Sequence, residues 1–257
     1  MSDKRRPYPM PYDVKNAVWK KLFRVLRTIP GIHLRHERRV RRFVDAVLDV
    51  CRSGCQWRLL PWVYGKWRTV HARFKSWSQK GVWEKLFENL KDAPDHEALM
   101  MDATIVRAHA CASGYRNQEN EGLGRSKGGF TTKIHALVDG LGNPLAFRLT
   151  GGQRHEITQA EALLGDHRGT WVIADKGYDR NALIQHSQEQ HGTPVIPPRK
   201  NRKNPRDDDK HWYRERHLIP CFFGQMKHFR RVCSRFDKSA QAFLSFLHIV
   251  GALIWIK

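Results

Sequence analysis

Apolar residues recur at helical spacing along the first third of the chain. They return every three or four positions in AVWKKLFRVL (17–26) and VRRFVDAVLDVC (40–51), as on the buried face of an amphipathic helix. Gly54 is placed to end the second helix, and Gly81 divides the next helical stretch into two. Helices joined by such short turns predict an all-helical domain over residues 15–92.

The pattern then changes to strands and short helices. Asp102 lies inside the apolar run ALMMDATIV, which predicts a strand. FTTKIHALV (130–138) and LAFRLT (145–150) flank a Gly- and Asn-rich turn and predict a β-hairpin. TWVIAD, which ends at Asp175, predicts a further buried strand with helical stretches before and after it. This order predicts an α/β domain built around a mixed sheet over residues 93–257.

Positive charge dominates the composition, with 46 Lys and Arg against 25 Asp and Glu and a formal net charge of +21. An excess this large favours a polyanionic partner, and we expect nucleic acid. The basic, Pro- and Tyr-rich residues 1–14 predict an extended arm. The apolar run that ends the chain is interrupted by Ser245 and His248, so we expect no membrane span and a cytoplasmic, nucleoid-associated protein.

Asp102 and Asp175 are the residues on which the predicted chemistry depends. A carboxylate inside a buried strand is unfavourable unless it is paired or binds a metal ion. Two carboxylates on neighbouring strands suit Mg²⁺, which prefers a few carboxylates together with water and phosphate oxygens. Two such ions about 3.5–4 Å apart activate the attacking oxygen and stabilise the leaving oxygen of a phosphodiester. For either aspartate alone, a strand-end cap or a salt-bridged core residue is the alternative.

Several long motifs, in order along the chain, resemble those of one protein family. They are MDATIVRAHACASG, KGGFTTKIHALVDGLGNPLAFRLTGGQRHEITQAEALL, VIADKGYD, and YRERHLI followed by FFGQMKHFRRVCSRFDK. Together with the upstream GCQWRLLP and WRTVHARFKSWSQKGVWEKL, they resemble bacterial insertion-sequence transposases of the IS5 group over about residues 10–255.

The resemblance implies a ribonuclease-H-like mixed-sheet catalytic core, preceded by a helix-turn-helix-like DNA-binding domain. It also implies an Asp-Asp-Glu triad with two Mg²⁺ ions, for which Mn²⁺ is an expected substitute. Such a site cuts double-stranded DNA at transposon ends and joins the 3′ ends to a target. Joining needs two ends held together, so we expect a homodimer or larger assembly on DNA. A metal-dependent nuclease that is not a transposase is an alternative.

The third acid of the triad is where this chain departs from the family pattern. The two aspartates match the first two acids, and Tyr213, Arg216 and Lys227 fit the signature around the third. Pro220 occupies the position of the expected glutamate. It carries no carboxylate, and proline inside a helix costs about 3 kcal/mol. We therefore predict an impaired transposase, with a catalytically inactive protein that binds or bridges DNA ends as the alternative.

The proline also bears on its neighbours. A helix that restarts at Pro220 would carry Tyr213 and Arg216 away from the face that Lys227 occupies. Glu215 is then the alternative third acid, if a kink at the proline turns it inward.

Basic residues in both predicted domains are candidates for DNA contacts, with solvated surface charges as the alternative. In the helical domain, those expected to recognise transposon ends are Arg38, Arg39, Arg41, Arg42, Lys66, Arg68, Arg73 and Lys75. Near the two aspartates, the residues expected to contact DNA are Lys133, His135, Arg154, Lys176, Tyr213, Arg216, Lys227, Arg230 and Arg231.

Overall fold

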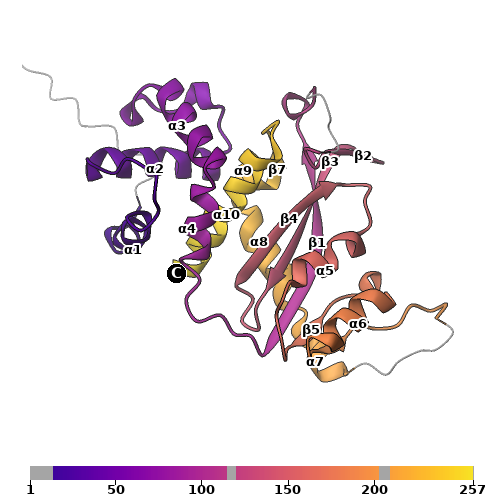
Figure 1. Ribbon diagram of the computed structural model, residues 1–257. Coiled ribbons are helices and arrows are strands. Elements are labelled where there is room, and N and C mark those ends of the chain that lie inside the picture. The colour runs from indigo at the N-terminus through magenta and orange to yellow at the C-terminus, as the bar shows by residue number, and fades with distance from the viewer. Residues whose placement is uncertain (1–13, 115–119, 203–208, 257) are drawn as a thin grey trace, which may run out of the picture.

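The structure, a computed structural model, describes residues 14–114, 120–202 and 209–256 (Figure 1). The predicted N-terminal arm therefore lies outside the described residues, except for Val14. Helices of the N-terminal domain are α1 (Asn16–Leu26), α2 (Glu37–Ser53), α3 (Trp67–Gln79) and α4 (Val82–Glu88), with short 3-10 turns η1 (Trp57–Leu59) and η2 (Trp62–Tyr64). The all-helical character predicted for this part of the chain is confirmed.

Gly54 ends α2 as the sequence predicts. It has a left-handed backbone (φ 69°), and its N–H donates to the Val50 carbonyl at 2.9 Å. A Cβ atom added to Gly54 would lie 2.9 Å from Cβ of Arg230, so this position also lets the C-terminal part of the chain approach α2 closely. Glycine meets both requirements because it has no side chain.

A mixed sheet of seven strands forms the second half of the molecule, in the order β2-β3-β1-β5-β6 with β4 on β3 and β7 on β1. The strands are β1 (Ala98–Ala108), β2 (Gly124–Ser126), β3 (Gly129–Val138), β4 (Pro144–Gly151), β5 (Trp171–Ile173), β6 (Thr193–Val195) and β7 (Ser234–Arg235). β3 runs antiparallel to β1 and to β4, whereas β5 runs parallel to β1 and to β6. The predicted hairpin and the predicted mixed α/β class are both confirmed.

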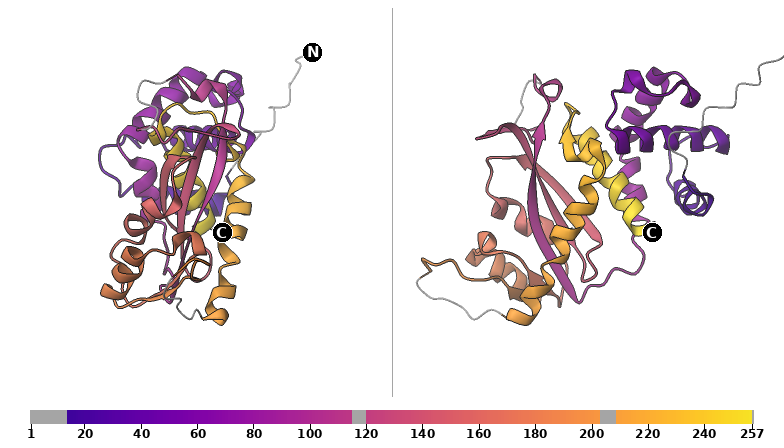
Figure 2. Two further views of the ribbon diagram at one scale, coloured as in Figure 1. Left: turned by 90° about the vertical axis from the view of Figure 1, so that its right-hand side faces the viewer. Right: turned by 180° about the vertical axis from the view of Figure 1, so that it is seen from behind.

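Helices cover both faces of this sheet (Figure 2). The remaining helices are α5 (Ala160–Leu164), α6 (Asn181–Glu189), α7 (Lys210–Glu215), α8 (Leu218–Lys227), α9 (Arg230–Cys233) and α10 (Ala240–Ile256). One face, which carries Met100 and Ile134, packs against α8 and α10. The opposite face, which carries Leu99 and Leu137, packs against α5 and α6. Successive apolar residues of β1 and β3 therefore point alternately into two hydrophobic cores, one on each face of the sheet.

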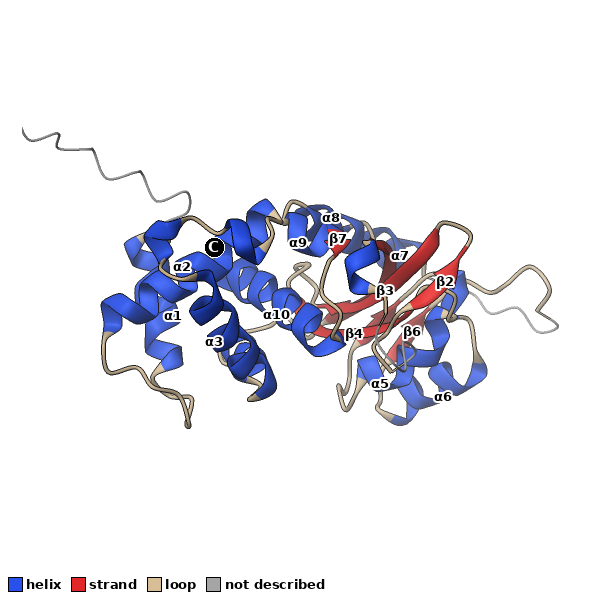
Figure 3. Cartoon of the chain, turned by 90° about the horizontal axis from the view of Figure 1, so that it is seen from above, coloured by secondary structure: helices blue, strands red, loops and turns tan. Residues whose placement is uncertain are grey.

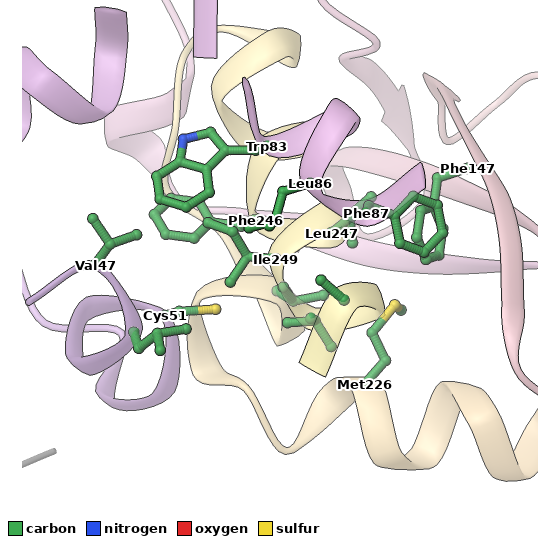
Figure 4. Close-up of a cluster of buried hydrophobic side chains, with 14 of the residues drawn as sticks. Val47, Cys51, Trp83, Leu86, Phe87, Phe147, Met226, Phe246, Leu247 and Ile249 are labelled. Carbon is green, nitrogen blue, oxygen red and sulfur yellow. The ribbon is translucent and has the colours of Figure 1, made fainter. Parts of the chain in front are cut away.

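The first of these cores continues from the sheet into the helical domain (Figure 4). α10 packs along α4 and against β4, so Trp83 and Phe87 of α4 share one apolar cluster with Phe246 of α10 and Phe147 of β4. The two predicted domains are therefore joined by a common hydrophobic core across residues 92 and 93. Among the described helices, α10 included, we find none with the length and apolar character that crossing a membrane requires.

Candidate active site

The pairing of β1 with β5 places Asp102 beside Asp175. Met100 pairs with Ile173 in the parallel register, and each aspartate lies two residues further along its segment. Side chains two residues apart in a strand point to the same face. Met100 and Ile173 both lie in the core on the α8 side, so the two carboxylates emerge on that side of the sheet.

A single guanidinium group links the two carboxylates. Nη2 of Arg216 lies 2.9 Å from Oδ2 of Asp102 and 3.9 Å from Oδ2 of Asp175. The remaining contacts are with the backbone: Asp102 Oδ1 accepts the Ala103 N–H at 2.7 Å, and Asp175 Oδ1 accepts the Gly177 N–H at 2.8 Å. Asp175 therefore also caps the turn that follows β5. The structure brings together the two acids singled out in the sequence and adds an arginine between them.

Burial raises the pKa of the Asp102 carboxyl, and the negative charges of Asp175 and Glu156 act in the same direction. The Ala103 N–H and the positive charge of Arg216 oppose this effect. The ionised form of Asp102 thus depends on nearby positive charge.

Pro220 lies in the first turn of α8, where it is exposed to solvent. α7 ends at Glu215, and α8 begins at Leu218, two residues before the proline. The first four N–H groups of a helix have no partner within it, so a proline in this turn does not break the helix. The expectation that the helix restarts at Pro220 is wrong, because the break comes earlier.

Arg216 and Lys227 remain on the same side of the molecule despite that break. Arg216 reaches Asp102, and Nζ of Lys227 donates to Oγ1 of Thr104 at 2.6 Å, on the same face of β1. The expected separation of Arg216 from Lys227 is therefore also wrong. Position 220 precedes Lys227 by seven residues, or about two turns, and so lies on the same side of α8 as Lys227.

Among the described residues, two acidic side chains, Asp102 and Asp175, lie within ion-pair distance of Arg216. No group of three or more His, Cys, Asp or Glu side chains within the described ranges is arranged to hold a metal ion. Glu156, on the turn after β4, instead pairs with Lys133 at 3.3 Å. Asp102 and Asp175 fit the preference of one divalent cation for carboxylate oxygens, but the three-carboxylate set that the resemblance implies is incomplete.

Lys133 and His135 do not lie on an exposed face of the hairpin, so the surface position expected for them is wrong. His135 is fully buried and its Nε2 lies 2.8 Å from Oγ1 of Thr150, while Lys133 donates to the Arg154 carbonyl at 2.8 Å. Burial, together with the charges of Lys133 and Arg148, lowers the pKa of His135 to about 4. The reason is that β3 is an inner strand whose second face is covered by α5.

Three of the predicted DNA-contacting arginines hold elements of the fold together. Arg231 is buried and forms two hydrogen bonds with Asp237, at 3.0 and 2.8 Å. Arg41 donates to Asn16 at 2.7 Å and so connects α2 to α1. Arg73 lies 4.6 Å from the ring centroid of Phe43. Contacts of these guanidinium groups with DNA would compete with these internal contacts.

The other predicted DNA contacts differ in exposure. Tyr213 is half-buried against the hydrophobic core. Basic residues of the predicted set that are exposed are Arg38, Arg39, Arg42, Lys66, Arg68, Lys75, Arg154, Lys176 and Arg230. Their roles remain predictions.

Two further residues lie beside the aspartates: Thr104, which sequence reasoning does not single out, and Tyr178, which follows Asp175 by three residues and is buried rather than exposed to DNA. Thr104 receives the hydrogen bond from Lys227, and its position two residues after Asp102 on a strand was the available signal. The Tyr178 hydroxyl is buried and has no hydrogen-bond partner among the described residues. Burial raises its pKa, and the charges of Glu156, Asp102 and Asp175 add to this effect.

Comparison with known proteins gives matches over both halves of the chain. Residues 93–254 match the family of the transposase DDE domain, and residues 14–87 match a family described as putative transposases of the IS4/5 family. A putative transposase for insertion sequence element IS6501 from Brucella ovis is 37% identical over 129 residues, which make up 49% of this chain and 99% of the relative.

Two further matches are more distant. A putative transposase for insertion sequence element IS402 from Burkholderia cepacia is 28% identical over 135 residues, or 48% of this chain and 62% of the relative. The piggyBac transposase in its synaptic complex with hairpin DNA aligns with a TM-score of 0.49 at 12% identity, over 99% of this chain and 68% of that chain.

Proposed function

This chain belongs to the DDE transposases, and on that premise we propose that it binds the terminal repeats of an insertion sequence and acts on phosphodiester bonds there with impaired efficiency. The observation that carries the proposal is the placement of Asp102 and Asp175 within 4.0 Å of one nitrogen of Arg216. Asp175 follows the end of β5, Arg216 lies between the two acids, and Lys227 lies on the same face of β1 as Asp102. Such a site accommodates a phosphodiester with its negative charge.

Domains of this family use divalent metal ions, and Asp102 and Asp175 are the residues that would hold one here. We expect Mg²⁺, with Mn²⁺ as a substitute. A bound cation supplies Lewis-acid stabilisation of the oxygens that attack or leave the phosphorus. The chain itself contributes the rest: Arg216 balances the charge of the aspartates in the absence of a cation, and Lys227 lies beside them on the α8 side as a phosphate contact.

Pro220 limits this chemistry. A glutamate at this position would lie on the side of α8 that carries Lys227 and would bring a third carboxylate to this helix, whereas proline supplies neither charge nor a ligand atom. The second ion of a two-ion site would lack a carboxylate. We therefore propose reduced cleavage and strand transfer rather than a change of substrate.

DNA is the partner that the charge of the molecule favours, at a formal +21. The exposed basic residues named above are the proposed phosphate contacts. Strand transfer acts on two transposon ends, so we propose that two or more copies of the chain assemble on DNA.

The test compares the unaltered chain with the Pro220→Glu variant on duplexes that end in the element's terminal repeat. In the presence of Mg²⁺ or Mn²⁺, we expect the variant to nick the repeat at least about 100-fold faster, since it regains a ligand for transition-state stabilisation. Asp102→Asn in the same background is the control and should abolish nicking. Equally fast cleavage by the unaltered chain and the Pro220→Glu variant would contradict the proposal.

A second candidate function follows from the same position. Since Pro220 removes a carboxylate while the basic surface is retained, the chain is also suited to bind or bridge transposon ends without cutting them. Specific binding to the terminal repeat with no nicking in either metal would favour this function. Cleavage by the unaltered chain that depends on Asp102 would exclude it.

A further inference from the structure

The connection between α2 and α3 exposes two large apolar side chains. Leu59 is 69% exposed and Trp62 is 82% exposed, the highest value among the large hydrophobic residues that the structure describes as exposed. The connection belongs to the helical domain, which lies at the opposite end of the molecule from α6 (Figure 3). An exposed tryptophan on a well-ordered segment is a common feature of binding surfaces.

The segment is held in place by its other apolar residues. Leu60 and Tyr64, next to the exposed pair, are buried in the core. The backbone forms two successive 3-10 turns, in which the Leu60 N–H donates to Trp57 at 3.2 Å and the Gly65 N–H donates to Trp62 at 2.8 Å. Leu59 and Trp62 are thus displayed on a fixed support, so little conformational entropy is lost when they bind a partner.

Along the chain, the charges on both sides of this segment are of one sign. No acidic residue occurs between Asp49 and Glu84, a stretch that contains seven Lys and Arg residues: Arg52, Arg58, Lys66, Arg68, Arg73, Lys75 and Lys80. Two of them are anchored on one ring, since the guanidinium carbons of Arg58 and Arg68 lie 5.8 and 5.5 Å from the ring centroid of Trp67. Positive charge around Leu59 and Trp62 disfavours binding of this surface to a second copy of itself, because like charges repel, and it favours binding to a polyanion.

We propose that Leu59 and Trp62 form an apolar wedge that inserts against the bases of distorted duplex DNA while Arg58, Lys66 and Arg68 contact the flanking phosphates. The inference rests on the proposed function, because it requires that the chain binds DNA. Apolar side chains that enter a duplex unstack a base step, and aromatic side chains replace the lost stacking. Unstacking is less costly where a base pair is already mismatched.

The test uses two 30-base-pair duplexes that differ only by a central mismatch flanked by 2-aminopurine, together with the full-length chain. We expect the unaltered chain to bind the mismatched duplex more tightly and to raise the 2-aminopurine fluorescence. Trp62→Ala should bind the mismatched duplex about 5- to 10-fold more weakly and lose the fluorescence signal, while its binding to the fully paired duplex and its salt dependence change little. Trp62→Phe, which keeps a ring, should retain the preference.

The controls separate the wedge from the phosphate contacts and from the fold. Lys66→Ala should weaken binding to both duplexes equally, and Leu141→Ala, which removes another exposed apolar side chain at the β3–β4 turn, should change neither. Unchanged mismatch preference in Trp62→Ala would overturn the inference, as would a change in oligomeric state with unchanged DNA binding, which would assign the surface to contacts between copies. If the unaltered chain bound neither duplex at low salt, the proposed function itself would fail.

Discussion

Two carboxylates held side by side repel each other unless positive charge lies between them. In this protein Arg216 provides that charge. Arg216 lies in the two-residue break between α7, which ends at Glu215, and α8, which begins at Leu218. The guanidinium lies between the two acids that would hold a divalent cation. Cation binding and the Arg216 contact are therefore competing interactions.

This competition gives a prediction that does not depend on catalysis. Arg216→Ala should bind Mn²⁺ about tenfold more tightly than the unaltered chain, because a competing positive charge has been removed. Isothermal titration calorimetry of the protein without DNA measures the affinity. Lys227→Ala is the matched control: it removes a cation that contacts Thr104 rather than a carboxylate, so its Mn²⁺ affinity should change much less. Weaker Mn²⁺ binding by Arg216→Ala would contradict the competition.

The sequence predicts the positions of the two site aspartates well, and it predicts the burial of the basic side chains less well. Asp102 and Asp175 were found because each is a charged residue beside a run of apolar ones, a pattern that demands an explanation. The burial of Lys133 and His135 was missed, since alternation on a strand separates two faces without telling whether both are covered. The sequence does not show that Arg231 and Arg41 are held internally, because their partners Asp237 and Asn16 lie on other elements or in other turns.

Among the elements, α10 contacts both the helical domain and the sheet. It packs on α4, α3, α9 and β4, and Gly251 is a point of close approach. A Cβ atom added to Gly251 would lie 2.6 Å from Cε2 of Phe87 and 3.1 Å from Cε2 of Phe147. This glycine therefore allows one helix to contact both the helical domain and the sheet.

Two helical glycines give a matched pair of predictions. Gly251→Ala should lower the free energy of unfolding by about 1–3 kcal/mol, because the added methyl group overpacks the contact with Phe87. Gly224→Ala in α8 should raise it by up to about 1 kcal/mol, since no atom lies within 4 Å of the new Cβ and alanine favours the helix. Urea unfolding followed by tryptophan fluorescence measures both. Changes of the same sign in the two variants would argue against this packing.

At the scale of elements, the sequence predicted most of what the structure contains. The β3–β4 hairpin, the helix end at Gly54 and the strand before Asp175 all carry strong local signals, and the strand order agrees with the ribonuclease-H-like fold of the DDE domain. The short strands β2 and β7 were not predicted, because two or three residues contain no usable alternation. The sequence predicts the helix break at Pro220, because proline is a visible helix-breaking signal. The break lies at residues 216–217, where Arg216 contacts Asp102, and the sequence gives no sign of that contact.

The whole molecule combines a large positive charge with an elongated arrangement of two joined domains, the helical one at one end and the sheet at the other (Figure 3). Positive charge spread over both domains favours contact with a long polyanion rather than with a compact acidic ligand. Each phosphate contact releases condensed counterions, so the affinity for DNA depends on the salt concentration.

We expect the dissociation constant for a terminal-repeat duplex to rise by about 100-fold or more between 50 and 200 mM NaCl, the response of about four neutralised phosphates. Fluorescence anisotropy with a labelled duplex measures this change. Replacing the exposed pair Arg38 and Arg39 with alanine should lower the slope of the logarithmic plot if both contact phosphates. An affinity that stays constant over this range would rule out binding through phosphate contacts.

The position of α10 along the chain has a consequence for how the protein is made. α10 follows every other described helix, yet it covers the apolar side of α4 and part of the sheet. Domains usually fold one after another as they leave the ribosome, beginning at the N-terminus. Here the core of the helical domain is completed only when α10 has been made. A message truncated before the codon for residue 240 would leave the apolar side of α4 exposed, and it would yield an aggregation-prone fragment rather than a smaller DNA-binding protein.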